Sequence, residues 1–322
     1  NVERRPRSVG VVKMPASLLS RLSWSVPSPR RRSEDDMKRV EALGIDGKWV
    51  KPRSALTIEA KVGRGGFGEV FRCRLGGEVM VAKQIDTSSM PVGDKHLLQN
   101  EVRCWSGLSH EGVVRFRGVV PSGRKPGRCY LLCDYCAGGS LHDRFKRHRA
   151  AQTPPPAAAA VADDMLQVAS AMAHLHACGI VHRDLKSANV LVSGAGRLCV
   201  ADFGLVRQVC SDGDMTAETG TYKWMAPEVV RHEAYGLPCD VYSFSILMWE
   251  ALTYQVPYAG LTPVQAALSV AKQGLRPSIP AEAPRELAAL CEACWAQDAA
   301  LRPTFVQAIA QLTDILRRAS GA

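Results

Sequence analysis

The hydrophobic pattern of this chain changes its period once, and that change limits which folds are open to it. From Ala55 onward the apolar residues form short runs with β-branched side chains and Gly-Gly turns, which is typical of antiparallel strands. Helical spacing interrupts these runs once, at 94–105. We therefore predict a small antiparallel sheet with one helix, its strands at 57–62, 70–75, 79–85, 113–120 and 129–135.

Beyond the Thr153-Pro154-Pro155-Pro156 segment the apolar residues recur every three or four positions, beginning with Val161, Met165, Val168, Met172 and Leu175. This spacing places one apolar face along a helix. Further helices are predicted near 240–253, 263–273, 284–296 and 303–318. The expected fold class is therefore α+β, with the sheet in the first part of the chain and most helices in the second.

Composition excludes several classes of protein. The 322 residues are 46% hydrophobic and 22% charged, which is ordinary for two domains or one large two-lobed domain. The best candidate for a membrane span, Val241 to Leu252, is short and contains Glu250, so no transmembrane segment is expected. Eleven cysteines, an odd number without a signal peptide, favour a reduced intracellular compartment. The CxxC pairs at 133–136 and 291–294 lie in apolar runs, which favours packing over zinc binding.

Residues 1–54 differ from the rest in charge and texture. They are rich in Arg, Ser and Pro and show no sustained hydrophobic period, so we expect a mostly disordered basic arm. Within 1–53, 13 Arg and Lys face 6 Asp and Glu, a net charge of +7 out of +10 for the whole chain. The remaining +3 forms no evident basic stripe, and the arm's aromatic residues are Trp24 and Trp49. No specific nucleic-acid partner is therefore expected.

Two further interpretations of the arm stay open. Glu3 is the only acid through Ser33, a composition shared with organellar transit peptides, although cytoplasmic localisation is the main expectation. Arg30-Arg31-Arg32-Ser33 resembles a site for a basophilic kinase. The chain begins at Asn1 rather than Met, so its true start is left open.

The run Gly63-Arg64-Gly65-Gly66-Phe67-Gly68-Glu69-Val70 has the spacing G-x-G-x-x-G-x-V. Glycine-rich turns of this kind bind dinucleotides, nucleotides or nothing, so the context decides. Here a predicted strand, and not a helix, follows the run, which predicts a flap between two antiparallel strands. Because glycine lacks Cβ, the backbone N–H groups of such a flap can approach phosphate oxygens closely.

Charged motifs follow the flap in a fixed order. Lys83 ends an apolar strand, and Glu101 lies on the next helix, where it could pair with the lysine. Alone, each would be an ordinary surface charge. The chain then contains His182-Arg183-Asp184-Leu185-Lys186-Ser187-Ala188-Asn189, Asp202-Phe203-Gly204 and Ala226-Pro227-Glu228. Chance does not plausibly supply all of these together.

With these motifs, residues 55–318 resemble the eukaryotic protein kinases. The resemblance implies a two-lobed fold, with an N-lobe at 55–136, a C-lobe at 137–318 and a tail at 319–322. Within the family, Gly220-Thr221-Tyr222-Lys223-Trp224-Met225-Ala226-Pro227-Glu228 and Asp240-Val241-Tyr242-Ser243-Phe244 are similar to the tyrosine-kinase-like group. That group contains Raf, mixed-lineage kinases and plant or algal Raf-like kinases.

The resemblance implies ATP and Mg²⁺ as cofactors and a role for each motif. Lys83 would hold the α- and β-phosphates and Glu101 would hold Lys83. Asp184 would accept or orient the proton of the substrate hydroxyl, and Lys186 would neutralise the γ-phosphate. The expected Mg²⁺ ligands are the oxygens of Asn189 and Asp202. The remaining residues expected at the nucleotide, with Cys133 as gatekeeper and 134–136 as hinge, are Gly63, Arg64, Gly65, Gly66, Phe67, Gly68, Val70, Ala82, Cys133, Asp134, Tyr135, Cys136 and Leu191.

Other residues match scaffold positions of the family. By the resemblance, Arg302 would pair with Glu228, and Asp240 would lie under the catalytic loop. Trp105, where a smaller aliphatic residue is usual, and Ser245, where glycine is common, depart from the family pattern. These departures put the ease of helix movement in doubt and leave the expected chemistry unchanged.

The resemblance also suggests substrates and regulation. Lys186, two residues after Asp184, and Thr221 favour transfer to serine or threonine of protein substrates, with tyrosine as a minority possibility. Arg183 beside Asp184 predicts activation by phosphorylation between Asp202 and Glu228, with Thr216 and Thr219 as candidate acceptors for an upstream kinase. The alternative is a pseudokinase scaffold, which usually lacks a lysine or aspartate that this chain retains. Substrate identity and oligomeric state stay open.

Overall fold

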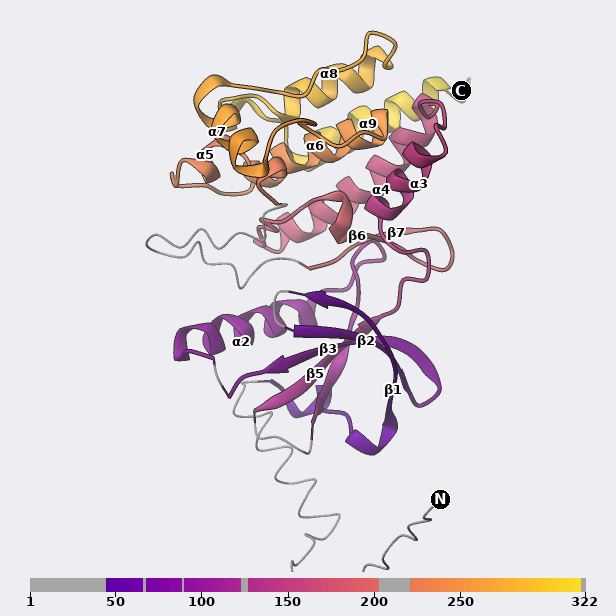
Figure 1. The fold of residues 1–322 in the computed structure, drawn as a ribbon, viewed down its shortest axis with the longest axis vertical. Helices are drawn as coiled ribbons and strands as arrows, with labels where there is room; N and C mark the ends of the chain where they lie inside the picture. The colour runs from indigo at the N-terminus through magenta and orange to yellow at the C-terminus, as the bar shows by residue number, and fades with distance from the viewer. Residues whose placement is uncertain (1–44, 66–67, 89, 123–126, 203–220, 320–322) are drawn as a thin grey trace, which may run out of the picture.

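The computed structural model describes residues 45–65, 68–88, 90–122, 127–202 and 221–319. Gly66, Phe67, Thr216, Thr219 and most of the predicted arm lie outside these residues. The chain forms a sheet-containing small lobe and a helical large lobe, which lie one above the other in Figure 1. This arrangement confirms the predicted α+β fold.

The small lobe contains a five-stranded antiparallel sheet with the order β1-β2-β3-β5-β4. One helix of this lobe, α2 (Val92–Gly107), follows β3 in the chain. The predicted strands and helix are therefore confirmed, with ends that differ by up to three residues. The strands are β1 (Leu56–Gly65), β2 (Gly68–Leu75), β3 (Glu78–Asp86), β4 (Phe116–Pro121) and β5 (Arg128–Asp134).

The sheet has two unlike faces because side chains alternate along each strand. One face joins the main hydrophobic core through Leu131 and Cys133 on β5. The opposite face holds a second, smaller cluster of buried residues, made of Leu56, Cys73, Met80, Ala82, Val120 and Leu132. On β3, residues that are one apart therefore belong to different environments.

Residues 45–54 do not behave as the predicted arm. Ile45 is 6% exposed, and the Trp49 ring lies 5.2 Å from the ring of Phe116 in an edge contact. The Lys51 amide donates to the carbonyl of Val119 on β4 at 2.8 Å. The predicted arm boundary at 54 is therefore wrong for this stretch, which includes two short 3₁₀ helices, η2 (Gly47–Trp49) and η3 (Arg53–Ala55). Its apolar residues are too few to form a period, yet they suffice to cover β4.

The large lobe is built around α6 (Pro238–Thr253), in which every residue from Cys239 to Leu252 is buried. The predicted helices are confirmed, and the short strands β6 (Val190–Val192) and β7 (Leu198–Val200) lie on the side of this lobe that faces the small lobe (Figure 1). In the described part of the chain, no helix has the length and apolarity needed to cross a bilayer. The other elements are α4 (Ala158–Ala177), η4 (Ser187–Asn189), η5 (Thr221–Trp224), α5 (Pro227–Val230), α7 (Pro263–Gln273), α8 (Arg285–Cys294), η6 (Ala299–Leu301) and α9 (Phe305–Ala319).

Helix α3 (Leu141–Ala150) was not predicted from the sequence. Its buried residues are Leu141 and Phe145, and the remainder is mainly basic, so the hydrophobic period is short. A capping box between Ser140 and Asp143 starts the helix. Such a box satisfies backbone donors at the first turn, and it is the sequence signal that could have identified the helix.

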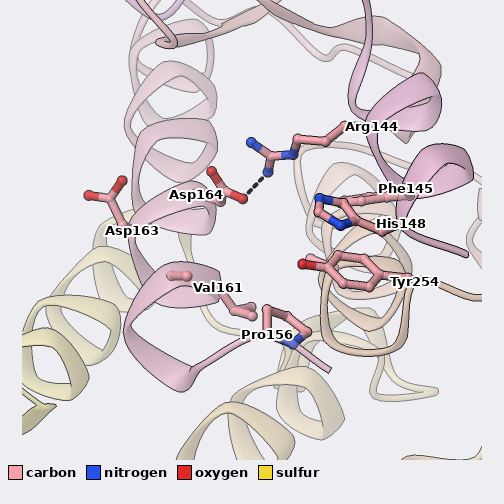
Figure 2. A pocket seen from close by; sticks show the side chains of 10 residues that line it. Arg144, Phe145, His148, Pro156, Val161, Asp163, Asp164 and Tyr254 are labelled. Carbon is pink, nitrogen blue, oxygen red and sulfur yellow. Dashed lines mark hydrogen bonds and ion pairs between the residues drawn. The ribbon is translucent and has the colours of Figure 1, made fainter. Parts of the chain in front are cut away.

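Side chains of α3, α4 and the end of α6 surround a pocket of about 280 Å³ (Figure 2). Arg144 forms an ion pair with Asp164 across it, and the rings of His148 and Tyr254 stack at 4.5 Å. Burial raises the pKa of Asp164, against the charge of Arg144. The pocket shares no lining residue with the site predicted from the sequence, so it belongs to the packing of α3.

Candidate active site

The glycine-rich run forms the end of β1 and the start of β2, as the predicted flap requires. Gly65 pairs with Gly68 and Arg64 with Glu69, so the two strands approach each other across 66–67. Gly68 has φ of 151°, and a Cβ built on it would collide with the carbonyl oxygen of Gln84 on β3. Glycine is therefore required at this position by both backbone conformation and space.

Lys83 lies on β3 between Val70 on β2 and Leu131 on β5. Its ammonium forms an ion pair with the carboxylate of Asp202 and lies 5.7 Å from the centre of the Trp105 ring. The predicted glycine flap and the predicted metal ligand are thus brought to the same end of the small lobe as the lysine. The ion pair between Lys83 and Asp202 was not predicted from the sequence.

The predicted ion pair between Lys83 and Glu101 is not formed in the described structure. Glu101 Oε2 is buried and has no hydrogen-bond partner there. Burial raises the pKa of Glu101 to about 7, although the charge of Lys83 opposes this shift. The expectation is wrong for this conformation, because Lys83 forms its ion pair with Asp202 instead of Glu101.

Trp105 fixes the end of α2 that follows Glu101. Its indole nitrogen donates to the carbonyl of Val114 at 2.7 Å, and its ring packs 5.2 Å from that of Phe116. The side chain is almost fully buried. The residue singled out as a departure from the family pattern therefore anchors α2 to the segment that enters β4.

The predicted adenine site lies where β5 leaves the sheet. Cys133 is buried and pairs with Val81, while 134–136 follow directly. Ala82 is misplaced in the sequence prediction, because it pairs with Phe71 and Leu132 on the face opposite Lys83. Val81 shares the face of Lys83, since residues two apart on a strand point the same way. That alternation is the signal that could have identified Val81.

Leu191, also predicted at the nucleotide, lies on β6. It pairs with Cys199 on β7 and forms a bridge to Ser140. Backbone bonds connect the segment after the hinge to the same strand, because the Gly138 amide donates to the Val192 carbonyl at 2.9 Å. The chain after β5 is thus tied to the top of the large lobe.

Asp184, Lys186 and Asn189 converge within one short loop. Lys186 Nζ lies 3.0 and 3.1 Å from the two carboxylate oxygens of Asp184. Asn189 Nδ2 donates to the carbonyl and to the carboxylate of Asp184, at 2.8 and 2.9 Å. The predicted catalytic residues therefore form a single hydrogen-bonded cluster, with the aspartate held from both sides.

A fourth side chain joins this cluster from a distant part of the chain. Thr221, at the start of η5, has its hydroxyl 2.8 Å from Lys186 Nζ and is 4% exposed. Lys186 thus connects Asp184 to Thr221. Lys186 and Thr221 are the two residues from which the resemblance predicts transfer to serine or threonine.

The loop before Asp184 is held from below by Asp240. This carboxylate, at the first turn of α6, accepts from the amides of His182 and Arg183 at 2.7 and 2.8 Å. Arg183 has a positive φ of 66°, a conformation that needs such external support. The expected role of Asp240 under the loop is thereby confirmed.

His182 is the other buried support of the loop. Its Nε2 lies 3.1 Å from the carbonyl of Ala201, the residue before Asp202. Burial lowers the pKa of His182, which favours the neutral ring. The ring thus joins the loop of Asp184 to the segment after β7 that carries Asp202.

The guanidinium of Arg183 lies over the ring of Tyr235, 5.7 Å from its centre, and the residue is exposed. The phosphate acceptors predicted for it lie outside the described residues, so their phosphorylation stays a prediction. Arg302 forms a two-armed contact with Glu228, at 2.7 and 2.8 Å. The expected scaffold pair is confirmed, and both partners are buried.

The donor set suits a hard cation bound together with phosphates. Both hydrogen bonds that the Asn189 side chain makes within the described residues use its nitrogen, which leaves the amide oxygen for a cation. Asp202 contributes a half-exposed carboxylate. No group of three His, Cys, Asp or Glu suited to a metal is found among the described residues. Two protein oxygens plus phosphate oxygens and water match the preference of Mg²⁺.

Comparison with known proteins agrees with this geometry. Residues 56–312 match the family described as protein tyrosine and serine/threonine kinase. The chain is 38% identical over 270 residues to serine/threonine-protein kinase STY17 of Arabidopsis thaliana, a match that covers 84% of this chain and 46% of that protein. It thus spans about half the length of that relative.

Two other relatives extend the comparison. Mitogen-activated protein kinase kinase kinase 10 of Mus musculus is 35% identical over 274 residues, covering 81% of this chain and 28% of that protein. Serine/threonine/tyrosine-protein kinase HT1 of Arabidopsis thaliana is 31% identical over 294 residues, covering 90% and 73%. The predicted similarity to plant Raf-like and mixed-lineage kinases is confirmed. This chain belongs to the protein tyrosine and serine/threonine kinase family.

Proposed function

We propose that this chain transfers the γ-phosphate of ATP to serine or threonine side chains of protein substrates, with Mg²⁺ as cofactor. One observation carries the proposal: the hydrogen-bonded cluster of Asp184, Lys186, Asn189 and Thr221. It combines a carboxylate that can accept a proton, a fixed cation and an amide oxygen free for a metal. These are the parts that phosphoryl transfer requires.

The nucleotide would bind between the two lobes. The β1–β2 flap offers backbone N–H groups to the phosphates, and Lys83 offers a positive charge to the α- and β-phosphates. The adenine would lie between two surfaces, the face of β3 that carries Val81 and the side chain of Leu191 on β6. The backbone of 134–136 would lie beside it. The ammonium of Lys83 forms an ion pair with the carboxylate of Asp202 in this structure. It would have to leave that carboxylate in order to bind the phosphates.

Asn189 and Asp202 would hold Mg²⁺. When bound, the cation neutralises charge on the phosphate oxygens and so eases attack on the γ-phosphorus. The chain's own residues supply the remaining requirements. Asp184 faces the space that a substrate hydroxyl would enter and accepts its proton, while Lys186 stabilises the charge that develops on the γ-phosphoryl oxygens.

The preference for serine and threonine rests on Lys186 and Thr221. Their 2.8 Å contact places the lysine between Asp184 and the segment on which a substrate peptide would lie. The name of the relative STY17 supports this preference, and the name of mitogen-activated protein kinase kinase kinase 10 supports a place in protein-kinase signalling. Activation by an upstream kinase within 203–220 remains part of the proposal. Tyrosine as a further acceptor is supported by the name of HT1.

The test is phosphate transfer from labelled ATP to a peptide library by the full chain. Asp184→Asn removes the proton acceptor while keeping its shape, so we expect transfer to fall about 100- to 10,000-fold. Asp163→Asn is the matched control, because Asp163 is an exposed acid on α4 whose partner is Gln167. Nucleotide binding, measured separately, should survive Asp184→Asn.

A pseudokinase scaffold predicts a different outcome of the same experiment. It would bind ATP or a partner, yet label incorporation would be equal in wild type and Asp184→Asn. That result would remove the catalytic assignment and leave the fold and family untouched. Label on serine and threonine, absent from tyrosine after hydrolysis, would support the proposed specificity.

A further inference from the structure

A buried carboxylate lies behind the proposed catalytic cluster. Glu250, near the end of α6, is 4% exposed. Its Oε1 accepts from the hydroxyl of Ser187 at 2.9 Å, and its Oε2 accepts from the indole nitrogen of Trp224 at 2.8 Å. One carboxyl group thus contacts two segments that are far apart in the sequence.

Burial of the Glu250 carboxyl group costs free energy, so packing alone does not explain why a glutamate is present here. Burial raises its pKa to about 8, against the donors just named. In the described part of the chain no lysine or arginine lies within ion-pair distance of it, so neutral donors must replace its water. A carboxyl group that is buried without an ion-pair partner costs stability that an apolar side chain of similar size would avoid. Its value must therefore lie in the geometry that it imposes.

The two donors belong to the two halves of the proposed substrate site. Ser187 directly follows Lys186 and is part of η4, which ends at Asn189. Trp224 ends η5, the short helix that begins with Thr221, the partner of Lys186. Lys186 thus connects the two segments beside Asp184, and Glu250 connects them through Ser187 and Trp224.

A second contact from α6 reinforces the placement of Trp224. The hydroxyl of Ser243, two turns before Glu250, donates to the Trp224 carbonyl at 2.8 Å. The indole nitrogen and the backbone carbonyl of Trp224 therefore both form hydrogen bonds with α6. Since every residue of α6 from Cys239 to Leu252 is buried, the helix is a fixed reference for the two segments that it contacts.

We propose that Glu250 is a positioning residue for phosphate transfer, which sets the spacing between the loop of Asp184 and the segment Thr221–Trp224. The inference rests on the proposed kinase activity, since its readout is transfer to a hydroxyl. Loss of either donor should displace the substrate surface relative to Asp184. A displacement of about 1 Å lowers the rate of such a step about 100-fold.

Two variants remove the contact from opposite ends. Glu250→Gln keeps the shape but presents an NH₂ group to one of the two donors. Trp224→Phe removes the indole N–H alone. Trp249→Phe is the matched control, because Trp249 is also buried on α6 and donates to the carbonyl of Ser278 at 2.8 Å, away from the site. Each variant is measured for kcat and KM with peptide, for KM with ATP, and for melting temperature.

We expect kcat with peptide to fall about 10- to 100-fold in Glu250→Gln and in Trp224→Phe. KM for ATP should stay within about twofold, because Glu250 contacts no residue assigned to the nucleotide. Trp249→Phe should match wild type in kcat, even where its melting temperature falls as far. The double variant Trp224→Phe/Glu250→Gln should be no slower than Glu250→Gln alone. Both substitutions act on the same contact, the one between Trp224 and Glu250.

Equal kcat values for Trp224→Phe and Trp249→Phe would overturn the inference and show a purely structural carboxylate. A parallel loss of ATP binding would overturn it too. If Glu250→Gln does not fold, Trp224→Phe and Ser187→Ala carry the same test. A wild-type chain without any transfer activity would instead refute the proposed function, and the positioning role with it.

Discussion

Two glutamates, one in each lobe, have buried carboxyl oxygens, and the contacts of these oxygens differ. Glu101 in the small lobe has a carboxylate oxygen without a hydrogen-bond partner in the described structure. Glu250 in the large lobe accepts a hydrogen bond at each oxygen. Burial raises the pKa of both, to about 7 and about 8. A raised pKa therefore accompanies one incomplete and one complete set of contacts.

The same difference extends to the neighbours of each glutamate. Around Glu250 the side chains of Asp184, Lys186, Asn189 and Thr221 bond to one another. Around Glu101 the lysine that was expected to pair with it is engaged by Asp202. The large-lobe half of the site is thus already assembled. For the proposed triphosphate to bind, the small-lobe half would have to exchange partners, because Lys83 is paired with Asp202.

The largest effect should come from breaking the assembled half at Arg302. Arg302→Ala leaves Glu228 buried without its cation, and such a change costs about 4 kcal/mol of unfolding free energy. Urea unfolding measures the loss. Arg318→Ala is the control, since its pair with Glu286 is exposed and contributes less than about 0.5 kcal/mol. Equal losses in the two variants would contradict a rigid large lobe.

The incomplete half should reveal itself through pH. A carboxyl whose pKa is higher in the folded than in the unfolded state binds more protons when folded, so stability falls as pH rises. For Glu101 this fall runs from the unfolded pKa of about 4.5 to about 7 and amounts to about 3 kcal/mol. Above pH 7 the folded chain bears the full cost of the buried charge.

Glu101→Gln removes this titration. We expect the variant to lose less stability than wild type between pH 5 and pH 8, measured by urea unfolding at each pH. Glu250 titrates in the same direction and is present in both chains, so the difference between them reports Glu101 alone. Glu286→Gln, an exposed glutamate, should leave the pH dependence unchanged. Parallel curves for wild type and Glu101→Gln would show that Glu101 is partnered in solution.

Much of the fold followed from hydrophobic period, because strands and helices with a buried face repeat their apolar residues regularly. The exceptions are short or highly charged. Helix α3 buries two residues and is otherwise mainly basic, so its capping box was a better signal than its period. Asp184, Lys186 and Asn189 lie close together in the sequence, and in the structure Lys186 and Asn189 both contact the Asp184 carboxylate.

Contacts that depend on three-dimensional register were harder to predict. Ala82 was assigned to the nucleotide although strand alternation places Val81, and not Ala82, on the face of Lys83. The pairing of Lys83 depends on which of two acids is nearer, and no sequence pattern expresses that. Glu250 was visible only as a charge inside an apolar helix. Its partners Ser187 and Trp224 come from separate segments, so its contacts required the structure.

The smallest effect concerns the edge of the small lobe, where the predicted arm proved to be packed. Trp49→Ala removes the edge contact with Phe116, and because Trp49 is partly buried we expect a loss of about 2 kcal/mol. Lys48→Ala, in the same 3₁₀ helix and exposed, should change stability little. Deletion of residues 1–44 should resemble Lys48→Ala, whereas deletion of 1–53 should exceed Trp49→Ala, since it also removes the Lys51 bond to β4. If deletion of 1–53 leaves the melting temperature unchanged, the contacts of 45–54 do not stabilise the small lobe. Its sheet would then be stable without them, as the large lobe is.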